Sequence, residues 1–117
     1  MRVLLADDEP KVRSALRLIL EQLKEVDTVD EVTDARSLAE QIQTAPPDIL
    51  LVDWELPGLH PDSSISELRR RSPFKVIVLS GRCTTLPGAK NLGADAFVSK
   101  CESPDRLFAT LRAMGAD

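Results

Sequence analysis

The sequence of 117 residues is poor in the residue types that build disulfide frameworks and histidine metal sites. Its two cysteines, Cys83 and Cys101, are too few for such a framework and lack the spacing of metal ligands. Its single histidine, His60, has no local ligand motif, so we expect it to be exposed and without a functional role. A regulatory disulfide between the two cysteines is an alternative that a reducing cytoplasm disfavours, and a titration of free thiols would test it.

Long apolar segments are also missing. No stretch approaches the roughly 20 residues that span a bilayer, and no signal-peptide pattern opens the chain. We therefore expect no membrane segment and a cytoplasmic setting. The 15 basic residues are outnumbered by 19 acidic ones, and the net charge of −4 argues against a nucleic-acid-binding surface. The basic cluster at residues 69–71 is accordingly interpreted as a solvated helix end.

Aromatic residues are scarce, with three phenylalanines, one tryptophan and no tyrosine. The tryptophan, Trp54, directly follows Asp53. We expect it to be a partly exposed packing residue. Its fluorescence can report on Asp53 without interference from tyrosine.

The sequence does contain a regular alternation of strand-like and helix-like segments. Short apolar runs predict strands at residues 3–6, 27–32, 49–52, 76–79 and 96–98. Helical spacing of apolar residues predicts helices at residues 10–23, 38–45, 62–71, 84–93 and 104–114. Because Pro87 and Gly88 interrupt the fourth of these, we expect that helix to begin near Pro87 and to be short or irregular. No repeat or linker divides the chain, so a single α/β domain over residues 1–117 is predicted, with a parallel sheet covered on both faces.

Five polar residues lie at the carboxyl ends of four predicted strands: Asp7, Asp8, Asp53, Ser80 and Lys100. These ends share one edge of a parallel sheet, so the side chains are expected to converge there. Three carboxylates in one place repel one another, and Mg²⁺, which prefers oxygen ligands, would relieve that repulsion. A carboxylate nucleophile beside a divalent cation, an ammonium and a hydroxyl predicts a site that accepts a phosphoryl group.

Four motifs, taken in order, resemble the receiver domain of two-component response regulators over essentially the whole chain. They are Leu4-Leu5-Ala6-Asp7-Asp8-Glu9, Val52-Asp53-Trp54-Glu55-Leu56-Pro57-Gly58, Val78-Leu79-Ser80-Gly81 and Gly93-Ala94-Asp95-Ala96-Phe97-Val98-Ser99-Lys100. The last of them is similar to the LuxR-type (NarL/FixJ-like) subgroup. The resemblance implies a flavodoxin-like (βα)5 fold, doubly wound around a five-stranded parallel sheet of order 2-1-3-4-5.

The resemblance also implies a role for each acidic residue. Asp53 would accept the phosphoryl group from a histidine kinase. Asp8 and Asp53 would ligate Mg²⁺ together with the backbone carbonyl of Glu55, while Asp7 would act mainly through water and charge. Such a domain phosphorylates and dephosphorylates itself, and it is a conformational relay rather than a turnover enzyme.

The remaining residues of the resemblance form a switch. Lys100 would bind a phosphoryl oxygen, Ser80 would swing toward the phosphoryl group, and Phe97 would move inward behind it. The last two predicted helices and the strand between them would form the face that changes. Expected partners are the kinase and either a helix-turn-helix output domain, which would lie beyond residue 117, or a downstream protein. A homodimer is a further option. No nucleic acid or membrane is expected to bind this segment directly.

The sequence departs from the commonest receiver pattern in several positions. Cys101 follows Lys100 where many receivers have proline, and Pro87-Gly88 puts the usual dimer face in doubt. Phe97 replaces a frequent tyrosine, so its ring has no hydroxyl. Glu55 and Arg82 occupy two positions that tune dephosphorylation in the family, in a direction that the sequence does not reveal.

Other interpretations of the same residues are open. The acidic residues could cap helices or loops, Ser80 could be a turn serine, Lys100 a surface lysine and Phe97 plain core. A pseudo-receiver that acts only as a protein-interaction module is the main functional alternative, and failure to bind Mg²⁺ would favour it. A phosphatase with an aspartyl-phosphate intermediate, similar to the haloacid dehalogenases, fits less well because their acidic motif follows the first strand.

Overall fold

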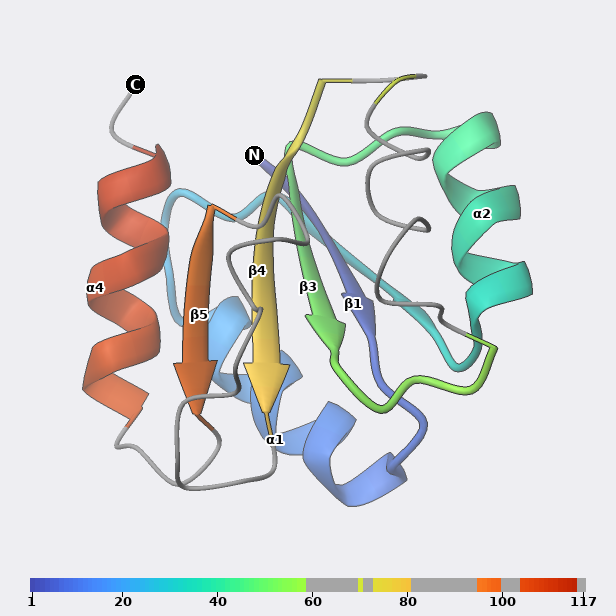
Figure 1. The fold of residues 1–117 in the computed structure, drawn as a ribbon. Helices are drawn as coiled ribbons and strands as arrows, with labels where there is room; N and C mark the ends of the chain where they lie inside the picture. Colours follow the sequence, from blue (N-terminus) through green and yellow to red (C-terminus); the bar gives the residue numbers. More distant parts are fainter. Residues whose placement is uncertain (59–69, 71–72, 81–94, 100–103, 116–117) are drawn as a thin grey trace.

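The computed structural model describes residues 1–58, 70, 73–80, 95–99 and 104–115, and it arranges them as an α/β fold (Figure 1). The strands are β1 (Arg2–Ala6), β2 (Thr28–Val32), β3 (Ile49–Asp53), β4 (Lys75–Ser80) and β5 (Ala96–Ser99). The helices are α1 (Pro10–Glu21), α2 (Ala35–Thr44) and α4 (Pro104–Gly115). None of the helices in these ranges is long and apolar enough to cross a membrane.

All five strands are parallel and form one sheet of order β2-β1-β3-β4-β5. The flavodoxin-like fold and strand order predicted from the sequence are therefore confirmed. Figure 1 shows the arrowheads of β1, β3, β4 and β5 at the same end of the sheet, which is the edge where the predicted site residues begin. Of the helix predicted at residues 62–71 only residue 70 is described, and it is helical. The helix predicted at residues 84–93, including Pro87 and Gly88, lies outside the described residues.

The central strands are apolar at consecutive positions because both faces of the sheet are covered. In β3, every residue from Ile49 to Asp53 is buried. Alternate residues of the strand belong to different hydrophobic clusters, since successive side chains point to opposite faces. Leu50 and Val52 pack with Leu38 and Ile42 of α2 on one face.

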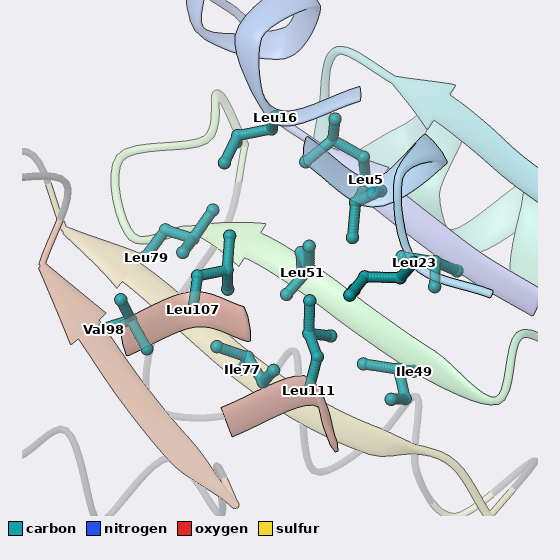
Figure 2. Close-up of a cluster of buried hydrophobic side chains, with 12 residues drawn as sticks. Leu5, Leu16, Leu23, Ile49, Leu51, Ile77, Leu79, Val98, Leu107 and Leu111 are labelled. Carbon is teal, nitrogen blue, oxygen red and sulfur yellow. The ribbon is translucent and has the colours of Figure 1, made fainter. Parts of the chain in front are cut away.

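The second cluster lies on the other face, under α1 and α4 (Figure 2). Leu51 lies at its centre, paired in register with Leu5 of β1 and Ile77 of β4. Leu16 of α1 and Leu107 of α4 pack against these strand residues on this face of the sheet. The three central strands are thereby held in a fixed register, which determines where their carboxyl ends lie.

The helix ends agree closely with the sequence signals. Pro10 and Pro104 are the first residues of α1 and α4. The N–H groups at the start of a helix have no partner within the helix, so proline, which lacks an N–H, costs no hydrogen bond there. Helix α1 ends at Glu21, two residues before the predicted end, so Leu23 lies beyond the observed helix, although it is still buried in the second cluster. Asp34 caps α2, its Oδ1 accepting a 2.7 Å hydrogen bond from the Ser37 N–H.

Candidate functional site

Two neighbouring strands place three carboxylates at the carboxyl edge of the sheet. Ala6 of β1 pairs with Val52 of β3, so Asp7 and Asp53 are the next residues along both strands. One carboxylate oxygen from each of Asp7, Asp8 and Asp53 lies within 4.8 Å of the others. The structure thus brings together three of the five residues that the sequence placed at this edge.

The three carboxylates differ in exposure. Asp7 is fully buried and Asp53 is 4% exposed, whereas Asp8 is open to solvent. Buried carboxylates require compensating partners, because removing a charge from water is costly. An all-oxygen set with one open side suits a hard cation that keeps some of its waters, as Mg²⁺ does.

The first acidic turn, residues 7–9, follows β1. Asp7 donates its N–H to the carbonyl of Val32 at 3.1 Å, which continues the pairing between β1 and β2. Its Oδ1 accepts a 2.9 Å hydrogen bond from the Glu9 N–H, and its carbonyl accepts a 3.0 Å bond from Nη1 of Arg13. Glu9 is the N-cap residue of α1, and its side chain makes no capping bond.

The second acidic turn, residues 53–58, follows β3. Oδ1 of Asp53 accepts a 3.1 Å hydrogen bond from the Glu55 N–H, and the Asp53 carbonyl accepts one of 3.1 Å from Leu56 N–H. Trp54 donates its N–H to the carbonyl of Leu79 in β4 at 2.9 Å. These backbone bonds hold the turn against the end of the sheet and leave the Glu55 side chain exposed.

The far end of the second turn is attached to the start of α2. The Ala35 N–H donates to the Pro57 carbonyl at 2.9 Å. Gly58 follows with a φ of +82°, and a Cβ at Gly58 would lie 3.3 Å from Cβ of Ala35. Glycine adopts this left-handed backbone without steric penalty, which allows the close approach. The adjacent cap residue, Asp34, has its pKa lowered chiefly by the hydrogen bond from the Ser37 N–H and further by the Ser37 hydroxyl.

Of the other predicted site residues, only some are described. Ser80 is the last residue of β4 and pairs in register with Ser99, but its side chain is outside the described set. Phe97 is half-buried and packs against the cluster under α2, as does the half-buried Trp54. Several residues named from the sequence lie outside the described residues: His60, Arg82, Cys83, Lys100 and Cys101.

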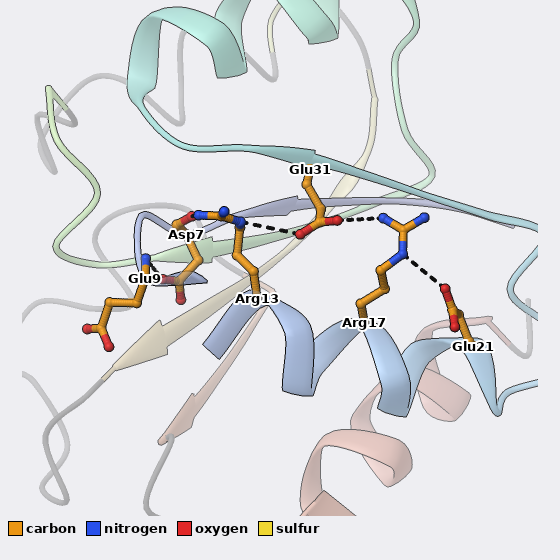
Figure 3. A network of polar contacts seen from close by, with 6 residues as sticks. All are labelled: Asp7, Glu9, Arg13, Arg17, Glu21 and Glu31. Carbon is orange, nitrogen blue, oxygen red and sulfur yellow. Dashed lines mark hydrogen bonds and ion pairs between the residues drawn. The ribbon is translucent and has the colours of Figure 1, made fainter. Parts of the chain in front are cut away.

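Arg13 is a contributor to the site that the sequence analysis did not identify. It is the fourth residue of α1, within the first turn of the helix, and its side chain reaches back to the Asp7 carbonyl and to Glu31 of β2 (Figure 3). The available signal was a basic residue on the helix that follows two aspartates. That signal is weak, because basic residues are common on exposed helices.

Comparison with protein families agrees with this geometry. The family model of the response regulator receiver domain matches residues 3–112. This chain belongs to that family. Receiver domains are signalling domains, and the acidic cluster at the end of β1 and β3 lies where the sequence motifs of the family predicted it.

Known relatives of this receiver domain include longer transcriptional regulators. The transcriptional regulatory protein TcrA of Mycobacterium tuberculosis is 32% identical over 117 residues, which cover 97% of this chain and 46% of TcrA. The DNA-binding transcriptional activator EvgA of Escherichia coli is 28% identical over 116 residues, which cover 97% of this chain and 56% of EvgA. The chain therefore spans about half the length of these relatives.

Solved structures support the subgroup predicted from the sequence. A LuxR-family response regulator from Aurantimonas sp. SI85-9A1 superposes with a TM-score of 0.87 at 25% identity, over 98% of this chain and 84% of that one. RcsB from Salmonella enterica serovar Typhimurium was solved bound to the promoter P1flhDC with the phosphomimetic BeF3⁻. It superposes with a TM-score of 0.87 at 28% identity, over 99% of this chain and 60% of that one. The receiver domain described here thus resembles those of LuxR-type regulators.

Proposed function

We propose that this receiver domain is a phosphorylation switch in which Asp53 accepts a phosphoryl group from a histidine kinase in the cytoplasm. The observation that carries the proposal is the close group formed by Asp53, Asp7 and Asp8, with Asp53 almost fully buried at the end of a central strand. The relative RcsB, solved with a phosphomimetic, supports the same class of function.

The acidic group fits Mg²⁺ through the chemistry of its donors, which are all oxygens. We assign Asp8, Asp53 and the backbone carbonyl of Glu55 as ligands, with Asp7 acting through water and charge. When bound, the ion would offset the charge of the carboxylates and of the incoming phosphoryl oxygens. The exposure of Asp8 leaves this side of the group accessible from solvent.

The transfer itself is an in-line displacement at phosphorus. One carboxylate oxygen of Asp53 forms the new P–O bond while the P–N bond to the kinase histidine breaks. The histidine nitrogen leaves with the bonding pair and takes up a proton. Lys100 and Ser80 are proposed to stabilise the charge on the equatorial oxygens, as the family motifs imply.

The phosphorylated state would be read on the surface formed by β5, α4 and the segment that precedes β5. Ser80 and Phe97 are the proposed switch residues, because new contacts to the phosphoryl group favour one arrangement of both. The relatives EvgA and TcrA are transcriptional regulators by name. We therefore propose an output domain, of the helix-turn-helix kind, as the downstream partner of this segment.

Intact mass after incubation with Mg²⁺ and acetyl phosphate tests the proposal. The native chain should gain one phosphoryl group as acetate leaves, and an Asp53→Asn chain should gain none. Trp54, next to the acceptor and packed against the core, should change its fluorescence in the native chain only. A native chain that gains no mass would refute phosphorylation at Asp53.

The Asp8→Asn variant tests Mg²⁺ binding separately from the stability of the fold. Asp8 is exposed and its neutralisation relieves repulsion with Asp7 and Asp53, so we expect the thermal unfolding midpoint to stay the same or to rise slightly. The fluorescence response to Mg²⁺ should weaken by at least about tenfold, because a carboxylate ligand is lost. A native chain that does not respond to Mg²⁺ at all would instead favour a pseudo-receiver that acts as an interaction module.

A further inference from the structure

Arg13 connects the first acidic turn to the edge strand of the sheet (Figure 3). Its Nη1 donates to the carbonyl of Asp7 at 3.0 Å, and its Nε lies 3.3 Å from Oε1 of Glu31. The Arg13 side chain is 20% exposed and that of Glu31 is 29% exposed, so this pair is less accessible than the Arg2–Asp30 and Arg36–Glu40 pairs. The guanidinium is planar with several donors, which lets one side chain serve both partners.

These contacts close a ring around Asp7. The Asp7 N–H is bonded to the carbonyl of Val32, and the Asp7 carbonyl is bonded to Arg13. Arg13 is in turn paired with Glu31, the residue before Val32 in β2. Both backbone polar groups of Asp7 are therefore held from the β2 side. The peptide that begins the acidic turn has little freedom to rotate while the ring is intact.

We propose that Arg13 is a positioning residue of the acidic site, which holds the turn at residues 7–9 in the geometry that binds the divalent cation. This inference rests on the proposed function, because it assigns Arg13 to the Mg²⁺ site described above. Arg13 touches the backbone of Asp7 and acts through it.

Arg17 provides a matched comparison within the same helix. It also pairs with Glu31 and, in addition, with Glu21, and its side chain is 42% exposed. Among the described residues, Arg17 makes no hydrogen bond to Asp7. The two arginines therefore share the carboxylate of Glu31 and differ in the contact with the acidic turn.

Replacing Arg13 changes Mg²⁺ binding in two opposite ways, through its charge and through its position. Removing a positive charge near a cation site strengthens the attraction of the site for a cation. Removing a residue that holds the ligands in place weakens metal binding. A variant that keeps the net charge constant isolates the second effect, so Arg13 and Glu31 are best replaced together.

The experiment compares Arg13→Gln/Glu31→Gln with Arg17→Gln/Glu31→Gln. Both double variants lose one positive and one negative charge and replace the carboxylate of Glu31 by an amide. In the Arg17 variant Arg13 is retained, and the amide oxygen at position 31 can still accept its hydrogen bond. Titration of Trp54 fluorescence with Mg²⁺ should give an apparent dissociation constant about tenfold higher in the Arg13 variant than in the Arg17 variant. Equal dissociation constants, or tighter binding in the Arg13 variant, would overturn the proposal.

Amide hydrogen exchange without Mg²⁺ gives a second readout. The Glu9 N–H donates to Oδ1 of Asp7, so its protection reports on the turn itself. We expect that protection to fall in the Arg13 variant and to persist in the Arg17 variant. Unchanged protection in both variants would refute positioning by Arg13, even for a chain in which Mg²⁺ binding, and with it the proposed function, had failed.

Arg13→Lys keeps the inference testable if the double variant does not fold. Lysine retains the charge but has a single nitrogen, which cannot reproduce both bonds in the geometry of the guanidinium. We expect weaker Mg²⁺ binding and lower protection of the Glu9 amide than in the native chain. Native values for both quantities would overturn the proposal.

Discussion

The two acidic turns of the site, residues 7–9 and residues 53–58, begin in the same way. Each follows a central strand with an aspartate whose Oδ1 accepts a hydrogen bond from the backbone N–H two residues later. They differ in what holds them. The first turn is tied to β2 by the backbone bond from Asp7 to Val32 and by a charged side chain, Arg13, whereas the bonds that tie the second turn to β4 and α2 join backbone groups.

This difference indicates how each turn tolerates change. Backbone bonds survive most substitutions, since they do not depend on the side chain. The second turn, which carries the phosphoacceptor candidate Asp53, is therefore robust except where the backbone itself is unusual, at Gly58. The first turn depends on one arginine in addition to its backbone bond to Val32, so its geometry is open to change by a single substitution or by a partner that competes for Glu31.

Leu51→Ala should have the largest effect on stability, because this residue supports both turns. Leu51 is fully buried and lies between Leu5 and Ile77 in the sheet. We expect the free energy of unfolding to fall by about 2–5 kcal/mol, measured by urea denaturation. Leu18→Ala is the control, since Leu18 is 62% exposed and its loss should change stability by less than about 0.5 kcal/mol.

Gly58→Val should affect the second turn selectively. Valine at a φ of +82° is strained by about 1–2 kcal/mol, and its Cβ would press on Ala35. We expect lower stability and easier quenching of Trp54 fluorescence by acrylamide, while protection of the Glu9 amide stays native. Gly58→Asn, which tolerates this backbone region better, should lie closer to the native chain. Loss of Glu9 protection in the valine variant would show that the two turns are coupled.

Asp34→Ala should have a smaller effect that depends on pH. The folded-state pKa of Asp34 is lowered, so its carboxylate stabilises the fold above its unfolded-state pKa. This contribution is lost as the pH falls through the folded-state pKa. The unfolding midpoint of the variant should lie a few degrees below the native one near pH 7, and the difference should shrink near pH 3. A difference that stays constant with pH would contradict the capping role.

Arg17→Gln should have the smallest effect and provides the baseline for the first turn. Hydrogen bonds to Glu31 and then to Glu21 raise the pKa of the Arg17 guanidinium. Because the folded-state pKa of Arg17 is raised, the stability that its ion pairs contribute is present throughout the neutral pH range and is lost only in strong alkali. We expect a change in unfolding midpoint near the error of measurement, which disappears at high salt because the pair is exposed. A large effect would mean that the network as a whole, rather than Arg13, holds the turn.

The sequence predicted the fold and the acidic group because both depend on local patterns. Consecutive apolar residues in the segment ending at Val52 indicated a strand buried on both faces, and Asp53 after it indicated a polar residue at the edge of the sheet. Strands that run in parallel share that edge, so the meeting of Asp7, Asp8 and Asp53 followed without knowledge of any distance. The strand order itself came from the resemblance to receivers.

Other features arise from contacts between residues far apart in the chain. The ring of Asp7, Val32, Glu31 and Arg13 requires the register of β1 against β2 and the rotation of α1 about its axis. The bond between Ala35 and Pro57 requires α2 to begin beside the second turn. No local pattern reports such quantities.

The sequence by itself determined which strands are buried, which residues stand at their ends and which chemistry those residues support. The spacing of apolar residues and the residue types carry that information, because a strand ends where its apolar run stops and the next residue is polar. Only the tertiary structure decided how the two acidic turns are held, the first by Arg13 together with a backbone bond to Val32 and the second by backbone bonds to β4 and α2. The physical reason is that packing of both sheet faces sets the register and helix orientation that bring these distant groups within hydrogen-bond distance.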